Sequence, residues 1–196
     1  MKKHFSLLIM LCCFAPFLVG AQENTKEEKE DAGLLARAWY VTTHEGVFHR
    51  GVAVSAYGDE IQLEDGSWWT VHWSDRYQLS GWLTSDDVII TPNINGNYSY
   101  PYKLVNIVTG ASLQVYLASN PVLCHWIVSF DDIHDEVYLE DGSVWRINPV
   151  DAAALWTWGI NDLIILGLNA PEYSGNGPNI LINARTTTYV CGRCLN

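Results

Sequence analysis

Two segments of the chain repeat each other, and this repeat constrains the fold more than any other feature of the sequence. Residues 59–93 align with residues 135–169 without a gap, and 14 of the 35 aligned pairs are identical. The centre of the match reads D-E-[IV]-x-L-E-D-G-S-x-W in both copies. Because each copy of an internal repeat normally forms one structural unit, we expect two similar units in tandem. Residues that both copies share are expected to serve the fold.

The repeated centre predicts a β-hairpin whose register can be worked out. A three-residue Glu-Asp-Gly loop, with Gly66 in the left-handed conformation, places apolar side chains of both strands on one face, whereas a two-residue Asp-Gly loop does not. In the first copy these side chains are Ile61, Leu63, Trp69 and Val71, and in the second they are Val137, Leu139, Trp145 and Ile147. We therefore predict the longer, bulged loop in both hairpins.

The segments after each hairpin predict one short helical turn and three further strands. Matched residues follow the spacing Asp-x-x-x-Leu-x-x-Trp, with Asp75 and Asp151 at the helix N-cap and Leu and Trp on one helical face. About six short strands in a unit of about 75 residues favour a small antiparallel β-barrel or sandwich. The strand count resembles that of SH3-like barrels, and the repeat signature identifies no family.

The predicted fold class is thus all-β, as a tandem duplication of one small unit. The first β repeat is expected to cover residues 46–119 and the second residues 120–196. Residues 22–45 precede them as a charged linker and lead-in. Within this range, residues 22–31 are rich in Glu and Lys and bury too little apolar surface to order themselves. Residues 33–43 within it fit either a short helix or a strand.

The N-terminus has the pattern of an export signal, expected over residues 1–21. Lys2 and Lys3 precede an apolar stretch, Phe5–Val19, and the small residues Gly20 and Ala21 suit a cleavage site. No second long apolar segment follows, so stable membrane insertion is not expected after cleavage. We expect an exported protein, either periplasmic or secreted.

The formal net charge of −11 restricts the partners. A strongly acidic surface repels the phosphate backbone of nucleic acids and anionic lipid headgroups. We therefore expect no nucleic-acid binding. The partners that remain are a protein, a peptide or a polymeric sugar of the cell envelope.

Three cysteines would remain after signal cleavage: Cys124, Cys191 and Cys194. In an oxidising compartment they predict a structural disulfide, joining either Cys124 to one of the terminal pair or Cys191 to Cys194. The Cys191-x-x-Cys194 spacing also fits a redox motif, but no chain remains after it to form the helix that such a motif opens. A zinc site would need about four ligands, and no second pair of this kind is present.

The acidic and histidine residues suggest no catalytic, metal or cofactor site. Glu64-Asp65 and its copy Glu140-Asp141 suit the bulged turns, and the matched Asp86 and Asp162 suit strand starts. The histidines lack a recognisable metal or catalytic spacing, and His125 has no evident counterpart in the other copy. We expect structural roles for these residues.

Aromatic residues that only the first copy carries are the stronger functional signal. They are Trp68, Trp73, Tyr77, Tyr98, Tyr100 and Tyr102. If the segment that holds the last three is extended, they share one face. Exposed rings suit sugars, peptides or protein partners, but the same rings could pack between the two units.

These observations favour a non-enzymatic binding protein that uses an aromatic patch on the first repeat. One alternative is an envelope hydrolase with a site at the repeat junction, drawing on His72, Asp75 or the acidic loops. A second alternative is a redox-linked envelope protein that uses the C-terminal cysteine pair.

Overall fold

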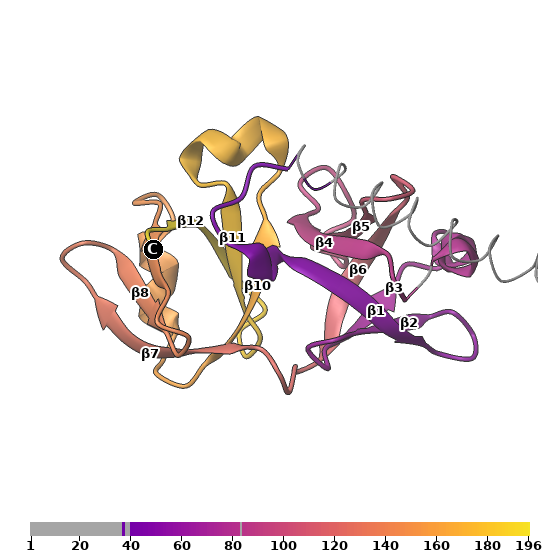
Figure 1. Ribbon diagram of the computed structural model, residues 1–196, viewed down its shortest axis with the longest axis horizontal. Helices are drawn as coiled ribbons and strands as arrows, with labels where there is room; N and C mark the ends of the chain where they lie inside the picture. The colour runs from indigo at the N-terminus through magenta and orange to yellow at the C-terminus, as the bar shows by residue number, and fades with distance from the viewer. Residues whose placement is uncertain (1–36, 38–39, 83) are drawn as a thin grey trace, which may run out of the picture.

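The computed structural model describes residue 37, residues 40–82 and residues 84–196 (Figure 1). The predicted signal peptide, with Cys12 and Cys13, lies outside the described residues, as does most of the predicted lead-in of residues 22–45. Within the described part, no helix has the length and apolar character that crossing a membrane would require.

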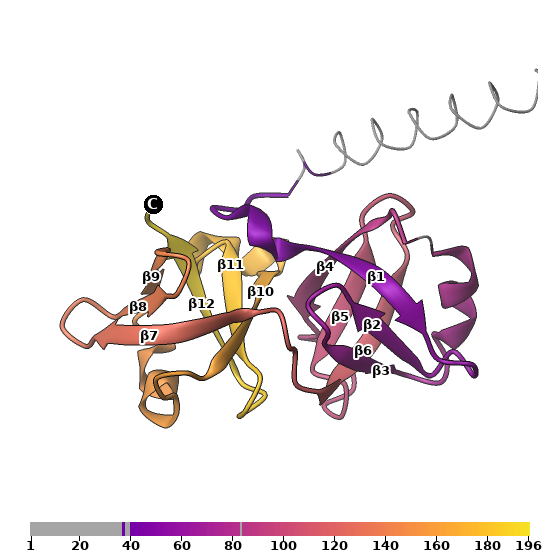
Figure 2. The same cartoon turned by 60° about the horizontal axis from the view of Figure 1, so that its bottom comes forward.

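The described chain forms two closed six-stranded antiparallel barrels that lie side by side (Figure 2). The first consists of β1 Phe48–Val54, β2 Glu60–Leu63, β3 Trp68–Val71, β4 Asp87–Pro92, β5 Tyr102–Asn106 and β6 Ser112–Ser119. The second consists of β7 His125–Asp131, β8 Glu136–Leu139, β9 Val144–Ile147, β10 Leu163–Leu168, β11 Asn179–Asn183 and β12 Tyr189–Cys194. The strand orders, β1-β2-β3-β6-β5-β4 and β7-β8-β9-β12-β11-β10, are the same. The predicted all-β tandem duplication is confirmed, and both units are barrels.

The helical elements are short 3₁₀ helices. They are η1 Glu45–Val47, η2 Arg76–Gly81, η3 Ala152–Thr157 and η4 Pro171–Asn176. η2 and η3 occupy the same place after β3 and β9, which confirms the predicted helical turn in each unit. η4 lies in the β10–β11 connection, where the β4–β5 connection of the first barrel has no helix.

The predicted hairpin register is confirmed in the first barrel. Ile61 pairs with Trp69 across β2 and β3, and the Leu63 amide donates a hydrogen bond to the Ser67 carbonyl (3.0 Å) around the three-residue loop. Gly66 has φ +84°, a conformation that an L side chain would strain. The inward side chains of the hairpin are buried, so one face of it forms the barrel core.

The second hairpin repeats this geometry, including a polar contact inside the core. Gly142 has φ +88°, and Trp145 is fully buried like Trp69. The Trp145 indole donates a hydrogen bond to the Ser143 hydroxyl (2.8 Å), and the Trp69 indole donates one to Ser67 (2.7 Å). A buried indole N–H needs such a partner, which explains why S-x-W is identical in both copies.

The predicted N-cap role of Asp75 and Asp151 needs correction. Both residues precede their 3₁₀ helices, but neither side chain makes a capping hydrogen bond. The Asp75 carboxylate accepts a hydrogen bond from the backbone amide of Gln114 (2.9 Å), and the Asp151 carboxylate accepts one from the backbone amide of Cys191 (2.9 Å). Each aspartate therefore ties its helical turn to the last strand of its barrel.

The barrels pack against each other through β4 and β10. Ile89 on β4 belongs to the apolar cluster of the second barrel, whereas its equivalent Ile165 on β10 belongs to that of the first. Val105 and Ile182 make the same exchange. Equivalent residues that exchange places give the local two-fold arrangement of a symmetric dimer. Gly167 permits this close approach, because an added Cβ would lie 2.5 Å from the Ile90 carbonyl oxygen.

Candidate functional site

Repeated histidine–glutamate pairs hold the acidic turns of both barrels. His49 Nδ1 lies 3.0 Å from Glu64 Oε1, and His125 Nδ1 lies 3.0 Å from Glu140 Oε1. Each glutamate also accepts a hydrogen bond from a backbone amide of β1 or β7. The expectation that His125 has no counterpart was wrong, because His49 and His125 occupy the same position at the start of the repeat. The turn role predicted for the glutamates agrees with these contacts.

The first of these pairs also joins the two barrels. His49 is 4% exposed, and its Nε2 donates to the Leu166 carbonyl of β10 (2.8 Å). Burial alone would lower the pKa of His49, but the Glu64 carboxylate raises it above its ordinary value. Burial alone would raise the pKa of Glu64, but the hydrogen bond from His49 lowers it. Both shifts favour the charged pair.

Matched aspartates support the turns after β5 and β11. The Asn106 side-chain amide donates a hydrogen bond to Asp86 (2.7 Å), and Asn183 donates one to Asp162 (2.7 Å). Both asparagines are fully buried, and their Oδ1 atoms accept backbone hydrogen bonds within the following turn. The contacts fit a structural role for the two aspartates, as the sequence suggested.

One acidic cluster near the barrel junction has the composition of a metal site. His125, Glu140 and Asp141 each offer a ligand atom, all within 4.8 Å of one another. His44 adjoins them, with its Nε2 3.6 Å from Asp141 Oδ2. However, His44 Nδ1 accepts the Gly46 amide hydrogen bond (3.0 Å), so the proton of the neutral ring lies on Nε2 and faces Asp141. Since the first barrel builds the same His–Glu pair, the turn geometry accounts for this cluster.

The residues suggested for a hydrolase do not form a catalytic relay. His72 Nδ1 lies 2.8 Å from Ser74 Oγ, and the Ser74 hydroxyl donates to Asp75 Oδ1 (2.7 Å). In a serine relay the hydroxyl proton goes to histidine, and the carboxylate orients the other ring nitrogen. Here the hydroxyl proton points to Asp75. Burial alone would raise the pKa of Asp75, but hydrogen bonds from Gln114 and Ser74 lower it below its ordinary value. A weakly basic carboxylate is a poor activator of serine.

The predicted disulfide is not formed, and Cys124, Cys191 and Cys194 are free thiols. Cys194 packs in the core of the second barrel, whereas Cys191, three residues earlier on the same strand, packs against the cluster of the first. Residues at odd separation on a strand point to opposite faces, so this pair cannot be bridged without distorting β12. Burial raises the pKa of Cys124 and of Cys191 to about 12, and such thiols are poor redox nucleophiles.

Four rings form a continuous group on the outside of the first barrel, which we call the aromatic face: His72, Trp73, Tyr100 and Tyr116. The ring centroids of His72 and Tyr100 lie 4.8 Å apart in an edge-to-face arrangement. Trp73 lies 5.6 Å from His72, and Tyr116 lies 5.5 Å from Tyr100. Trp73 is 74% exposed and Tyr116 39% exposed, so the rings contact one another and still present a surface.

The structure rearranges the predicted aromatic set. Tyr102 is fully buried against Trp69, with ring centroids 5.7 Å apart, so it belongs to the core and not to a binding surface. Its hydroxyl donates to the Thr187 carbonyl of the second barrel (2.9 Å). Tyr77 and Tyr98 are largely exposed but share no ring contact with the aromatic face, and Trp68 is half-buried on β3.

Tyr116 and His72 were missing from the predicted set. On β6 the buried positions alternate from Leu113 to Val115, which places Tyr116 on the polar, outward side of the strand. That alternation is visible in the sequence and could have identified the tyrosine. His72 could not be placed without the fold, because its ring partner Tyr100 comes from a distant loop.

Hydrogen bonds fix the loop that carries Tyr98 and Tyr100. The Asn93 side chain donates to the Tyr100 carbonyl (2.8 Å), and the Tyr100 amide donates to the Asn97 carbonyl (2.8 Å). A cavity of about 330 Å³ adjoins this loop. Its lining includes Tyr98, Ser99, Tyr116 and Thr187. Ring faces and polar groups are therefore presented together at this end of the barrel.

The second barrel has a pocket of about 570 Å³ at the equivalent place, which we call the basic pocket. Thr70 pairs with Tyr116 across β3 and β6, and Arg146 pairs with Arg193 at the same positions of β9 and β12. The loops correspond too, because the Asn169 side chain donates to the Gly177 carbonyl (2.9 Å) as Asn93 does to Tyr100. The same part of the fold is aromatic in one copy and basic in the other.

No family model, curated protein or solved structure matches the chain.

Proposed function

We propose that the protein is an exported binding protein, without enzymatic activity, whose aromatic face binds a neutral polysaccharide chain of the cell envelope. The single observation that carries this proposal is the group of four touching rings outside a barrel core that is complete without them. Large exposed rings that the fold does not need are available to stack on a ligand.

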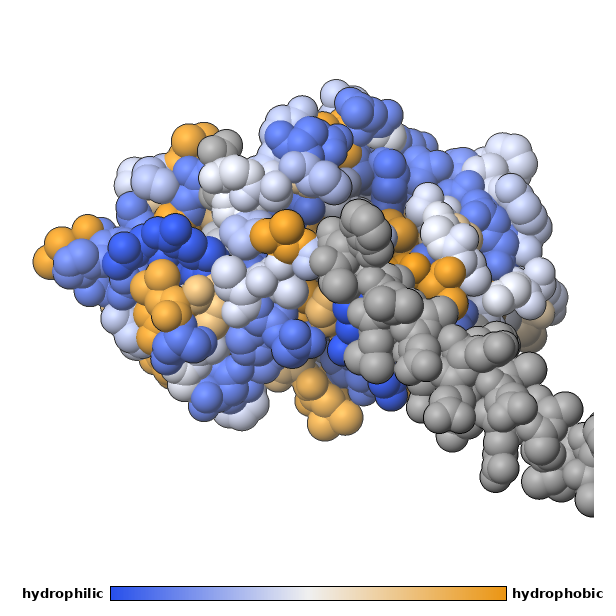
Figure 3. Space-filling model, turned by 45° about the horizontal axis from the view of Figure 1, so that its top comes forward, coloured by the Kyte–Doolittle hydropathy of each residue, from blue (hydrophilic) through white to orange (hydrophobic). Residues whose placement is uncertain are grey.

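The polar surroundings of the rings favour a sugar over an apolar partner. The Gln114 side chain, the Asp75 carboxylate and the Ser99 hydroxyl lie near the aromatic face. A sugar ring offers an apolar face for stacking and hydroxyl groups for hydrogen bonds, which is the combination presented here. The face of the molecule shown in Figure 3 is largely polar, with apolar residues in separate spots.

Charge favours an uncharged chain at this face. The protein carries a formal net charge of −11, and Asp75 adjoins the rings through Ser74 and Gln114. An anionic polymer would be repelled there. The export prediction supports an envelope location for the ligand.

The test is retention of the purified protein on insoluble envelope polysaccharide. Trp73→Ala should weaken binding at least tenfold, which corresponds to about 1.4 kcal/mol. The matched control is Trp156→Ala, because Trp156 is 88% exposed on η3 of the second barrel. Equal binding by both variants would contradict the proposal. Binding that disappears when envelope proteins are digested would show a protein or peptide partner instead.

A further inference from the structure

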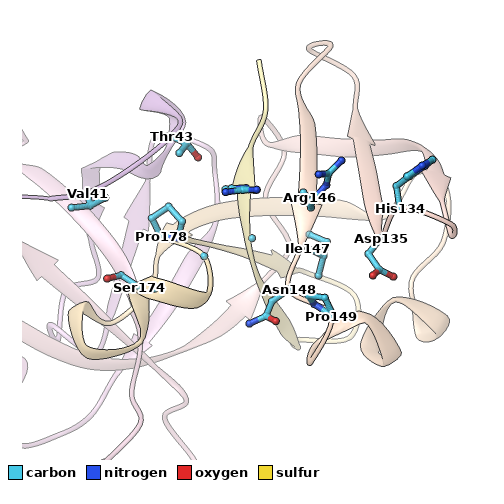
Figure 4. A pocket seen from close by; sticks show the side chains of 14 residues that line it. Val41, Thr43, His134, Asp135, Arg146, Ile147, Asn148, Pro149, Ser174 and Pro178 are labelled. Carbon is cyan, nitrogen blue, oxygen red and sulfur yellow. The ribbon is translucent and has the colours of Figure 1, made fainter.

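The basic pocket lies between the outer face of the second barrel and the β10–β11 loop (Figure 4). Arg146, Asn148 and Pro149 line it from β9 and the segment that follows, and Ser174 and Pro178 line it from the loop. Figure 4 shows His134 and Asp135 on the side of the pocket away from Ser174 and Pro178. The pocket is therefore bounded by two separate parts of the barrel.

Two arginines oppose each other in this pocket. Arg146 and Arg193 are direct partners across β9 and β12, and Glu136 pairs with Arg146 on its other side. The guanidinium of Arg146 forms an ion pair with Glu136, whereas Arg193 forms none with any described residue. Like charges directly opposite on a sheet are destabilising. The chain has only 11 lysines and arginines. Two of them are nevertheless neighbours here, and Arg193 has no acidic partner among the described residues.

The first barrel shows that the fold does not need these arginines. The same cross-strand pair is Thr70 and Tyr116 there, on a barrel of the same strand order. Neither arginine contributes to the core of the second barrel. Their pairing is therefore better explained by a ligand than by stability.

The wall of the pocket opposite β9 is fixed in place. Gly177 has φ +138° and packs on the backbone of Gly192, where an added Cβ would lie 2.7 Å from the amide nitrogen. The Asn169 side chain holds the same loop through the Gly177 and Tyr173 carbonyls. A preformed wall lowers the ordering cost of binding.

We propose that the basic pocket binds the oxyanion of a small ligand, a carboxylate or a phosphate, at Arg193. The planar guanidinium matches two oxygens that share a negative charge. Arg146, on the neighbouring strand, is already paired with Glu136, so Arg193 is expected to make the main contact. Asp135 also lines the pocket, so the anion is expected at the Arg193 end and not at the β8 end.

The experiment titrates the signal-cleaved protein with inorganic phosphate and, separately, with glucuronate, and glucose serves as the neutral control. Binding is followed by NMR of backbone amides and arginine Nε–H groups. Arg193→Gln is the main variant, and Arg193→Tyr installs the residue of the first barrel at that position. Lys103→Gln is the matched control, because it removes the same charge from the outer side of β5 in the first barrel.

In the wild-type protein, the Arg193 signal should shift saturably with at least one of the two anions. Both Arg193 variants should bind that anion about tenfold more weakly, because a charged hydrogen bond is lost. Response to glucuronate alone would identify a carboxylate ligand, and response to phosphate alone a phosphate ligand. Equal weakening by Lys103→Gln, or no saturable response to either anion, would overturn the proposal.

Discussion

The hairpin cores of the two barrels agree closely, whereas one outer face differs between them. Inside, each hairpin places the same tryptophan on the same serine hydroxyl, at 2.7 Å in the first barrel and 2.8 Å in the second. Outside, the pair Thr70 and Tyr116 becomes Arg146 and Arg193. Because both faces sit on one scaffold, their difference cannot be required by the fold. This difference supports the proposal that the two surfaces bind different ligands.

The largest expected effect tests whether the cores are equivalent. Trp69→Ala and Trp145→Ala each remove a fully buried indole and leave a cavity, so each should destabilise the protein by about 3–5 kcal/mol. Urea denaturation of the two variants measures this. A loss below about 1 kcal/mol in one variant only would show that the two tryptophans have unlike environments.

The next effect tests the contact between the barrels. Gly167→Ala would bring a Cβ against the Ile90 carbonyl, a backbone atom that cannot move aside freely, and should cost about 2–3 kcal/mol. The equivalent residue in the first barrel is Thr91, and Thr91→Ala should cost about 1 kcal/mol or less. Thermal denaturation of the two variants measures these losses of stability. Equal losses in Gly167→Ala and Thr91→Ala would contradict the packing described for β4 and β10.

The histidine pairs provide a pH-dependent comparison. His49 has a raised pKa and Glu64 a lowered one, so their stabilisation is complete between their ordinary pKa values of about 4.5 and 6.5. It is lost as the pH rises through the raised pKa of His49, or falls through the lowered pKa of Glu64. At pH 6, His49→Gln should cost about 1–3 kcal/mol.

Urea denaturation at pH 6 and pH 9 measures this contribution. The wild-type protein should lose more stability between these values than the His49→Gln variant does. The control is His125→Gln, since among the described residues His125 makes no hydrogen bond to the other barrel, whereas His49 is bonded to the Leu166 carbonyl. Identical pH dependence of wild type and His49→Gln would contradict a charged pair at the junction.

The smallest expected effect on stability is an exchange of the two outer faces. Tyr116→Arg and Arg193→Tyr each install a residue that the other barrel already carries at that position, so each should change the free energy of unfolding by only about 0.5 kcal/mol. Polysaccharide retention should fall for Tyr116→Arg and stay unchanged for Arg193→Tyr. Loss of retention in both variants would show that the faces do not act separately.

Local sequence patterns predicted the architecture well because its main determinants are local. The glycine of each three-residue loop and the alternation around Trp69 and Trp145 fix the hairpins, and these recur in both copies. His49 and His125 keep the register of the ungapped match when it is extended toward the N-terminus. Between them and the start of the repeated segment only Val52 and Val128 are identical, so the local similarity is too weak to mark their equivalence.

The candidate site was less accessible because its contacts are distant in the chain. Tyr98, Tyr100 and Tyr102 do not share a face, since residues 93–101 form a hydrogen-bonded loop and not an extended strand. The carboxylate of Asp75 finds its partner on β6, and Arg146 meets Arg193 only when β9 pairs with β12. Spacing along the chain contains no signal for such pairs.

Mapping the surface that neutral envelope polysaccharide contacts would test the central claim most directly. In an NMR titration with soluble fragments of that polysaccharide, we expect the Trp73 indole and the Tyr100 and Tyr116 amides to shift together and saturably. The Trp156 indole and the amides of Arg146 and Arg193 should remain unchanged. Shifts confined to the second barrel, or none at all, would contradict an aromatic face that binds sugar.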